Sequence, residues 1–257
     1  MNGMVSDAPV ILITGASGGL GAALAECYAG PGRILHLSGR DAARLSAVAA
    51  RARAKGALVR EMVIDVRDAA AMTAWLEGLT ELPDIVIANA GISGGTGARS
   101  GDEAERERAI FDVNVGGVLN TVLPLLDRMR RRGSGRIVLI SSLAGFRGLP
   151  SAPAYCASKA MVRVWGEGLR GWLAADGVGV SVICPGFVDT PMTRVNRFPM
   201  PFLMDAEKAA RIIRKGIDSG RARIAFPWPL AWGVTLLAAL PPAWTDRLLV
   251  RLPRKDG

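Results

Sequence analysis

Short, almost unbroken apolar runs alternate along the chain with longer segments in which apolar residues recur at helical spacing. The runs lie at residues 10–14, 34–38, 58–64, 85–88, 136–141, 179–184 and 223–226. The longer segments lie at residues 20–29, 42–55, 69–79, 103–131, 155–174 and 206–216. Strands that are apolar on both faces are typical of parallel sheets covered on both sides. The alternation therefore predicts an α/β protein with a doubly wound, mostly parallel seven-stranded sheet and helices on both faces.

Two stretches interrupt this alternation. Residues 91–101 are rich in glycine and serine and are predicted to form a loop after the fourth strand. Residues 190–205 combine three prolines with methionine and phenylalanine. Because this second stretch is too long and too proline-broken for an ordinary strand-to-helix turn, we expect a flexible apolar flap over a substrate.

The end of the chain differs in composition from the rest. Residues 226–244 carry no charge, but prolines leave only residues 230–240 uninterrupted. Such a helix is roughly 17 Å long against a hydrocarbon core of about 30 Å, so it is too short to span a membrane. Residues 244–252 show the pattern of a basic amphipathic helix. We expect the extension 226–257 to pack on the domain formed by residues 1–225, where it covers a pocket or a subunit interface or lies on an anionic membrane.

Composition narrows the function classes. The chain of 257 residues has 32 basic and 23 acidic side chains, a net charge of +9, which permits contact with phosphates, anionic lipid or nucleic acid. No groove-reading motif or set of stacking aromatic residues is recognisable, so we expect no nucleic-acid partner. Three widely spaced cysteines and one histidine argue against a disulfide framework and a multi-histidine metal site, and we expect no metal. The N-terminus lacks a signal-peptide pattern, which predicts a cytoplasmic location.

A glycine-rich turn follows the first predicted strand. Its sequence at residues 14–21 is Thr-Gly-Ala-Ser-Gly-Gly-Leu-Gly, and it leads directly into a helix. Glycines let the backbone approach a pyrophosphate closely, and the positive end of the helix then faces the anion. The turn predicts a phosphate-binding loop, the alternative being that its glycines only allow close packing of helix and strand.

A tyrosine and a lysine stand four residues apart near the start of a predicted helix. Residues at this spacing share a helical face, so Tyr155 and Lys159 can point into one cleft, although an exposed helical pair is the alternative. A fixed cation favours the phenolate and is predicted to lower the pKa of Tyr155 from its usual value near 10. Ser142 stands at the tip of the fifth strand, where a hydroxyl can bond a carbonyl oxygen, with Ser141 as the adjacent alternative.

In order along the chain stand a Thr-Gly-x-x-x-Gly-x-Gly turn, an Ala-Asn-Ala-Gly strand end, a Tyr-x-x-x-Lys pair and a Pro-Gly segment. Together they resemble the short-chain dehydrogenase/reductase family, in its short single-domain branch, over roughly residues 10–190. The resemblance implies a Rossmann-type domain that transfers a hydride between a nicotinamide and a carbonyl or secondary alcohol. It implies that Tyr155 is the general acid and base, that Ser142 orients the carbonyl, and that Lys159 tunes Tyr155 and holds the ribose. Asn114 would hold a water of a proton relay, a satisfied core amide being the alternative.

The resemblance also implies which residues bind the cofactor. They are Gly15, Ser17, Gly19, Leu20, Gly21, Arg40, Asp65, Asn89, Gly91, Tyr155, Lys159, Pro185, Gly186, Val188 and Thr190. Gly39 stands where NAD-binding members carry an acid, and Arg40 next to it supplies a planar cation for a 2′-phosphate. Asp41 is a competing acid, with the N-cap of the next helix as its other role. We expect NADP, with NAD as the alternative.

The partners follow from the same pattern. We expect a small carbonyl or alcohol substrate, apolar in character because the flap and the tail are apolar. The resemblance implies a homodimer or homotetramer formed through the long helices after the fourth and fifth strands. One alternative is a non-catalytic nucleotide-binding interaction protein on the same scaffold. The other is a reductase held at the inner face of a membrane by its C-terminal tail.

Overall fold

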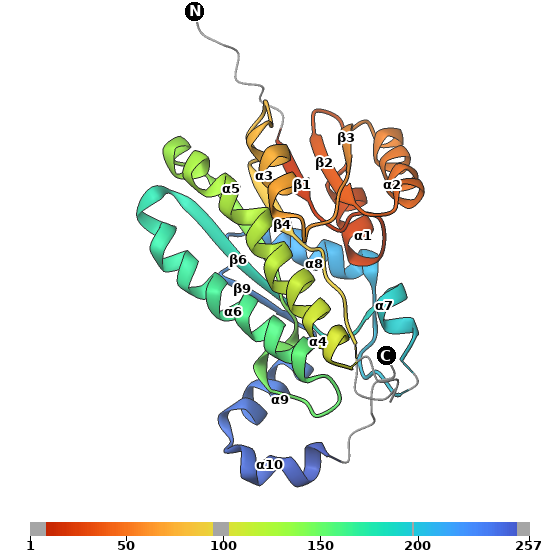
Figure 1. Ribbon diagram of the computed structural model, residues 1–257, viewed down its shortest axis with the longest axis vertical. Helices are drawn as coiled ribbons and strands as arrows, with labels where there is room; N and C mark the ends of the chain where they lie inside the picture. Colours follow the sequence, from red (N-terminus) through yellow and green to blue (C-terminus); the bar gives the residue numbers. More distant parts are fainter. Residues whose placement is uncertain (1–8, 95–102, 197, 251–257) are drawn as a thin grey trace, which may run out of the picture.

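The computed structural model describes residues 9–94, 103–196 and 198–250. Within these ranges seven parallel strands form one sheet in the order β3-β2-β1-β4-β5-β6-β9 (Figure 1). The strands are β1 Val10–Ile13, β2 Ile34–Gly39, β3 Leu58–Val63, β4 Ile85–Ala88, β5 Gly135–Ile140, β6 Val178–Pro185 and β9 Arg223–Phe226. Every pairing between them is parallel, which confirms the predicted doubly wound sheet.

Helices cover both faces of the sheet. They are α1 Gly19–Tyr28, α2 Ala42–Ala54, α3 Ala69–Glu77, α4 Glu103–Phe111, α5 Gly117–Arg132, α6 Pro153–Leu173 and α8 Ala206–Asp218. The buried side chains of α1, α2 and α8 belong to one core cluster, and those of α3, α5 and α6 belong to another (Figure 1). The sheet therefore lies between two helical layers.

Strand β1 shows why the apolar runs have no polar alternation. Ile11 and Ile13 point into the core beneath α1, α2 and α8, whereas Leu12 points into the core beneath α3, α5 and α6. All three side chains are fully buried. Because successive strand residues point to opposite faces, only a strand covered on both sides needs an apolar residue at every position.

The helix predicted over residues 103–131 is present but changes its hydrogen bonding in the middle. A π-helical turn, η1 Asp112–Gly116, joins α4 to α5. By length and hydropathy this is the one helix among the described residues that could cross a membrane. Half of its most apolar stretch is buried inside the protein, so it serves as a core helix against the sheet.

The predicted flap contains regular secondary structure and is not a single open loop. It contains a short helix, α7 Pro191–Arg194. Its two ends are held together as a small parallel sheet of β7 Val188–Asp189 and β8 Met204–Asp205. Part of the glycine-rich loop predicted at residues 91–101 lies outside the described residues, as does residue 197 of the flap.

The C-terminal extension begins within the sheet. Its first residue, Phe226, ends β9 and is buried in the core. Two helices follow, α9 Trp228–Ala239 and α10 Pro242–Leu249. In Figure 1 they form the lower end of the molecule, at the carboxyl end of β9. The predicted basic helix 244–252 therefore begins inside α10, and its last two residues lie outside the described ranges.

Candidate active site

The strand order reverses between β1 and β4, and the carboxyl ends of these strands open a crevice, which is where ligands bind in sheets of this kind. A cleft of about 810 Å³ lies there. Asn114 does not line it. The other predicted site residues all do: Gly15, Ser17, Gly19, Leu20, Gly21, Arg40, Asp65, Asn89, Gly91, Ser142, Tyr155, Lys159, Pro185, Gly186, Val188 and Thr190.

The glycine turn is folded tightly on itself. Gly15 has a φ of +66°, which L-residues rarely adopt. A Cβ on Gly21 would lie 2.2 Å from the carbonyl oxygen of Gly15 and 2.6 Å from Nδ2 of Asn89. The missing side chain at Gly21 thus lets the first turn of α1 close on the loop, which leaves the N-terminus of α1 facing the cleft.

Replacing Gly21 by alanine is expected to displace this turn. Overpacking of this kind costs about 1–3 kcal/mol, so NADPH affinity should fall roughly tenfold or more. Fluorescence titration with NADPH and thermal unfolding would measure both effects. Gly30→Ala is the matched control, because a Cβ there meets nothing within 4 Å. Unchanged NADPH affinity in Gly21→Ala would show that the turn does not bind the cofactor.

Asn89 ties the end of β4 to the glycine turn. Its Nδ2 donates to the carbonyl oxygens of Thr14 and Gly15 at 2.9 and 3.2 Å. Its backbone N–H donates to Oγ1 of Thr14 at 3.1 Å. A Cβ on Gly91, two residues later, would lie 3.1 Å from Oδ1 of Asn114 and 3.4 Å from Nζ of Lys159. The fourth strand therefore connects the glycine turn with the Lys159 side of the cleft.

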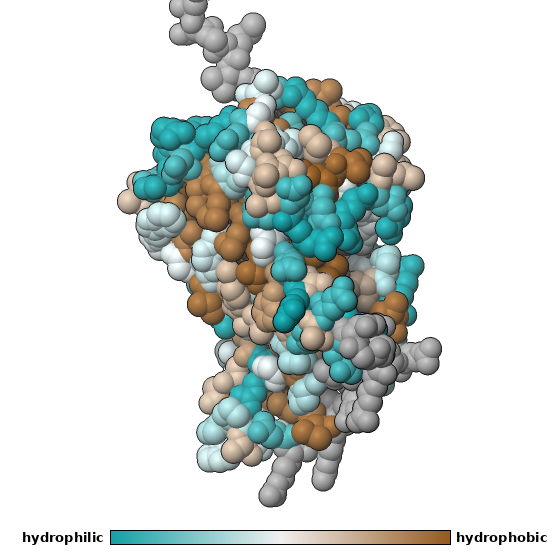
Figure 2. All heavy atoms as spheres, in the orientation of Figure 1, coloured by the Kyte–Doolittle hydropathy of each residue, from teal (hydrophilic) through white to brown (hydrophobic). Residues whose placement is uncertain are grey.

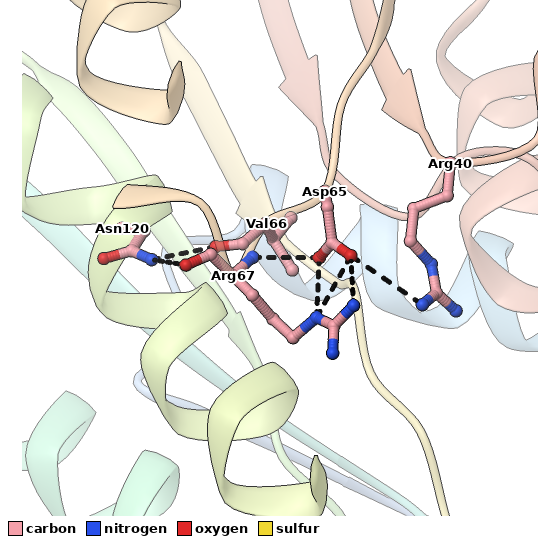
Figure 3. A network of polar contacts seen from close by, with 5 residues as sticks. All are labelled: Arg40, Asp65, Val66, Arg67 and Asn120. Atoms are coloured by element: carbon pink, nitrogen blue, oxygen red, sulfur yellow. Dashed lines mark hydrogen bonds and ion pairs between the residues drawn. The ribbon is translucent and has the colours of Figure 1, made fainter. Parts of the chain in front are cut away.

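Asp65 and Arg40 both line the cleft, and Figure 3 shows Arg67 and Arg40 on either side of the Asp65 carboxylate. Arg67 holds the carboxylate, with Nη2 at 2.7 Å from Oδ2 and its backbone N–H at 3.0 Å from Oδ1. These bonds lower the pKa of Asp65, so it is ionised at neutral pH. Arg40 is only loosely engaged, with Nη1 3.9 Å from Oδ2 of Asp65 and 60% of its side chain exposed. Its guanidinium can therefore turn towards an anion in the cleft.

A side chain at Gly39, at the strand end next to Arg40, would be crowded by Ser17. A Cβ on Gly39 would lie 3.0 Å from both Cβ and Oγ of Ser17. Asp41 accepts a hydrogen bond from the backbone N–H of Arg44 at 2.9 Å and caps α2, which confirms that role for it. Arg44, which was not among the predicted site residues, also lines the cleft. Its position four residues after Arg40, on the first turn of α2, was the available signal.

The tertiary structure separates the two adjacent serines. Oγ of Ser141 is buried and donates to the carbonyl oxygen of Lys159 at 2.7 Å, so it ties β5 to α6. Ser142 is half-buried, and its hydroxyl shares a hydrogen bond with the phenol of Tyr155. Its Oγ also lies 3.4 Å from the carbonyl oxygen of Pro185. Ser142 and Tyr155 are therefore the hydroxyls that can meet a ligand oxygen together.

Lys159 is buried behind Tyr155. Its ammonium donates to the carbonyl oxygen of Ile140 at 3.0 Å and lies 5.8 Å from the centre of the Tyr155 ring. Burial lowers the pKa of Lys159 to about 8.

The prediction that the pKa of Tyr155 is lowered is wrong, because the structure raises it. Burial raises the pKa of the phenol, and the hydrogen bond with Ser142 opposes that rise only in part. The physical reason is that desolvation disfavours the charged forms of both Tyr155 and Lys159.

Asn114 lies in the π-helical turn η1, an unusual backbone site, as its poor helix propensity suggested. Its Oδ1 accepts from the backbone N–H of Ile92 at 2.8 Å. Its Nδ2 donates to the carbonyl oxygen of Ile92 and to Oγ of Ser158, both at 3.0 Å. The amide is fully buried and has protein partners, which corresponds to the satisfied core amide. The proton-relay role stays a prediction.

The segment after β6 closes the remaining side of the cleft. A Cβ on Gly19 would lie 3.3 Å from Cγ2 of Thr190, so the flap begins directly over the glycine turn. Oγ1 of Thr193 donates to the carbonyl oxygen of Val188 at 2.6 Å and accepts from the N–H of Thr190 at 3.0 Å. These bonds hold the first turn of the flap beside Val188.

Comparison with known proteins agrees with this geometry. The family described as short chain dehydrogenase matches residues 9–199. An uncharacterized oxidoreductase of Myxococcus xanthus is 41% identical over 94% of this chain and 96% of its own. A Sphingobium yanoikuyae short-chain dehydrogenase solved with NADPH superposes with a TM-score of 0.80 at 27% identity, over 97% and 98% of the two chains.

A bulky-bulky ketone specific alcohol dehydrogenase of Comamonas testosteroni superposes with a TM-score of 0.78 at 26% identity. The match covers 97% of this chain and 96% of that one. Both the sequence match and the shared fold extend over the glycine turn, the Tyr155–Lys159 pair and the start of the flap. This chain therefore belongs to the short-chain dehydrogenase/reductase family of oxidoreductases.

Proposed function

We propose that the protein is an NADP-preferring oxidoreductase that reduces an apolar carbonyl compound, or oxidises the corresponding secondary alcohol, with Tyr155 as general acid and base. The observation that carries the proposal is the hydrogen-bonded pair of Ser142 and Tyr155 with Lys159 buried behind it, in one cleft with the glycine turn. A protein that only binds nucleotides has no use for two paired hydroxyls at this position.

In the reductive direction, Tyr155, Ser142 and Lys159 have different roles. The nicotinamide cofactor, when bound, supplies the hydride. The raised pKa keeps the Tyr155 phenol protonated at neutral pH, so it can donate its proton to the carbonyl oxygen of the substrate. Ser142 bonds the same oxygen and stabilises the charge that develops on it. Lys159 lies behind Tyr155, where its ammonium can stabilise the phenolate after the proton has left.

The preference for NADP is proposed from the end of the cleft around Arg40. No carboxylate is present at Gly39 to repel a 2′-phosphate, and Ser17 crowds that position. The carboxylate of Asp65 is already paired with Arg67, which leaves the guanidinium of Arg40 exposed and available for another anion. A planar guanidinium matches the geometry of a phosphate and binds it through paired hydrogen bonds.

Replacing Arg40 by alanine is expected to weaken the use of NADPH selectively. Hydrogen bonds to charged groups contribute about 1.5–3 kcal/mol, so kcat/KM with NADPH should fall roughly tenfold to a hundredfold. The value with NADH should stay near that of the wild type. Steady-state kinetics with both cofactors measure this change, and Arg211→Ala, an exposed arginine on α8, is the control. An unchanged ratio between the cofactors would move the assignment from Arg40 to Arg44.

The substrate is proposed to be apolar because apolar side chains border the catalytic end of the cleft. Ile92 and Met192 line it, and the flap presents Val195, Phe202 and Leu203 to the surface. The ketone-specific relative also acts on bulky substrates, as its name states. A panel of aliphatic and aromatic ketones, aldehydes and alcohols, followed at the nicotinamide absorbance, would test both the activity and the class. Turnover of none of them would contradict the proposal.

Self-association is proposed through the outer face of α5 and α6. Leu123, Val164 and Trp172 are exposed on these helices. Figure 2 shows hydrophobic side chains gathered over this part of the surface. An exposed apolar patch on a soluble protein commonly marks an interface, so we propose a homodimer or homotetramer, which light scattering would measure.

A further inference from the structure

Helix α9 is apolar on every side, although only one side is covered. Leu230, Ala231 and Val234 pack on the cluster of Leu143, Val182 and Cys184. On the opposite side stand Trp228, Trp232 and Leu236, with exposed fractions of 73%, 72% and 67%. These three side chains recur every fourth residue and therefore form one continuous stripe along α9.

The stretch of sequence around this stripe carries no charged residue. Residues 224–245 include no acidic residue, no basic residue and no histidine. Trp244, near the start of α10, adds a third indole with an exposed fraction of 75%. A helix with apolar residues on all sides is normally buried, so a second surface is expected to cover the stripe.

The chemistry of the stripe favours a lipid surface as that covering. Indoles are enriched where one end of the side chain is apolar and the other is hydrated, as at a membrane interface. Twelve residues span roughly 18 Å, too short to cross a hydrocarbon core of about 30 Å, so α9 can only lie in the interface. The net charge of +9 attracts the protein to anionic headgroups.

The size of the stripe argues against a second copy of this chain as the covering. Aromatic side chains of this kind bury about 150–250 Å² each, so the two indoles of the stripe offer roughly 300–500 Å². A standard interface between proteins buries about 800 Å² on each partner. We propose that the stripe Trp228, Trp232 and Leu236 docks the protein on the surface of an anionic lipid bilayer.

The docking stripe is rigidly connected to the candidate active site. Leu230, on the buried side of α9, lies against Gly186, where an added Cβ would be 3.0 Å from its Cδ2. The same buried side contacts the short helix η2 Leu143–Phe146, which directly follows Ser142. Ser142 and Gly186 line the cleft, so a bilayer bound at the stripe would lie close to it.

Sedimentation with sucrose-loaded vesicles tests the proposal on the full chain. Wild-type protein should bind vesicles of mixed phosphatidylglycerol and phosphatidylcholine at low salt and bind pure phosphatidylcholine more weakly. The apparent partition coefficient of the double variant Trp228→Gln and Trp232→Gln should be at least about tenfold lower than that of the wild type, because the variant loses the indole area that the bilayer would bury. Leu58→Gln, which removes an exposed apolar side chain from β3, is the control and should bind like the wild type.

Three outcomes would overturn the proposal. One is wild-type protein that stays in the supernatant with anionic vesicles. Another is a double variant that binds as well as Leu58→Gln. The third is a double variant whose mass by light scattering falls, because the stripe would then be a subunit interface. Thermal unfolding and NADPH titration establish that the variants are folded. Quenching of tryptophan fluorescence by brominated acyl chains gives a second readout that requires no variant, and bound protein without quenching would equally contradict docking.

Discussion

Replacing Tyr155 by phenylalanine is expected to abolish turnover while leaving NADPH binding intact. The phenol is hydrogen-bonded to Ser142 and can donate its proton to a carbonyl oxygen in this cleft. Phenylalanine keeps the ring but has no hydroxyl proton to donate. Positioned general acids contribute about 10²–10⁴-fold to rates, so kcat should fall by that factor. Steady-state kinetics with a substrate identified in the panel would measure the loss.

Tyr28→Phe is the matched control for this variant, because Tyr28 and Tyr155 are the two tyrosines of the chain. The Tyr28 hydroxyl is buried in the core beneath α8 and has no hydrogen-bond partner among the described residues. Its removal should leave both turnover and NADPH affinity unchanged. If Tyr155→Phe turned over like Tyr28→Phe, proton transfer would have to be assigned to another group.

Replacing Lys159 by methionine is expected to have two opposite effects. Turnover should fall about 10²-fold or more, because the phenolate formed at Tyr155 loses the cation behind it. At pH 7 the free energy of unfolding should rise, because the variant no longer buries the ammonium of Lys159, a residue that is only 4% exposed. Methionine has nearly the same length and fills the same space.

The pH dependence of stability follows from the pKa of Lys159. The folded-state value of about 8 lies below the unfolded value near 10.4, so the folded state binds fewer protons between these two pH values. The wild type is therefore expected to gain stability as the pH rises from about 8 to about 10.4. Below pH 8 both states are protonated and the unfavourable burial is fully present.

The expected difference between Lys159→Met and wild type is on the order of 2 kcal/mol at pH 7. This is about 3 kcal/mol from the pKa difference, reduced by the lost hydrogen bond to the carbonyl oxygen of Ile140, about 1 kcal/mol. The difference should shrink as the pH approaches 10. Urea unfolding at several pH values measures it, with Lys208→Met, an exposed lysine on α8, as the control. A variant less stable than the wild type at pH 7 would mean that the interactions of the Lys159 ammonium in the folded state outweigh the cost of burying it.

Most of the sheet and the placement of the cleft could be predicted because they depend on local patterns. Each parallel strand is covered on both faces, so its residues are apolar at every position, as in β1 with Ile11, Leu12 and Ile13. The glycine turn follows directly from β1, and its glycines are required by contacts within the turn itself. The spacing of Tyr155 and Lys159 places them on one face of α6.

The features of the site that the sequence did not predict depend on contacts between segments that are distant along the chain. Ser141 and Ser142 are adjacent serines, and the packing of β5 against α6 directs the hydroxyl of Ser141 to the backbone of Lys159 and that of Ser142 to Tyr155. Arg67 takes the carboxylate of Asp65 and leaves Arg40 exposed, an arrangement that no spacing rule indicates.

The sequence by itself determined the order of the candidate site residues along the chain: a glycine-rich turn first, then a serine, a tyrosine and a lysine at strand and helix ends. The tertiary structure alone decided the protonation of that site, because burial raises the pKa of Tyr155 and lowers that of Lys159. It also decided which side of α9 is covered. Desolvation and solvent exposure are properties of surrounding atoms brought together from the whole chain, so no local pattern encodes them.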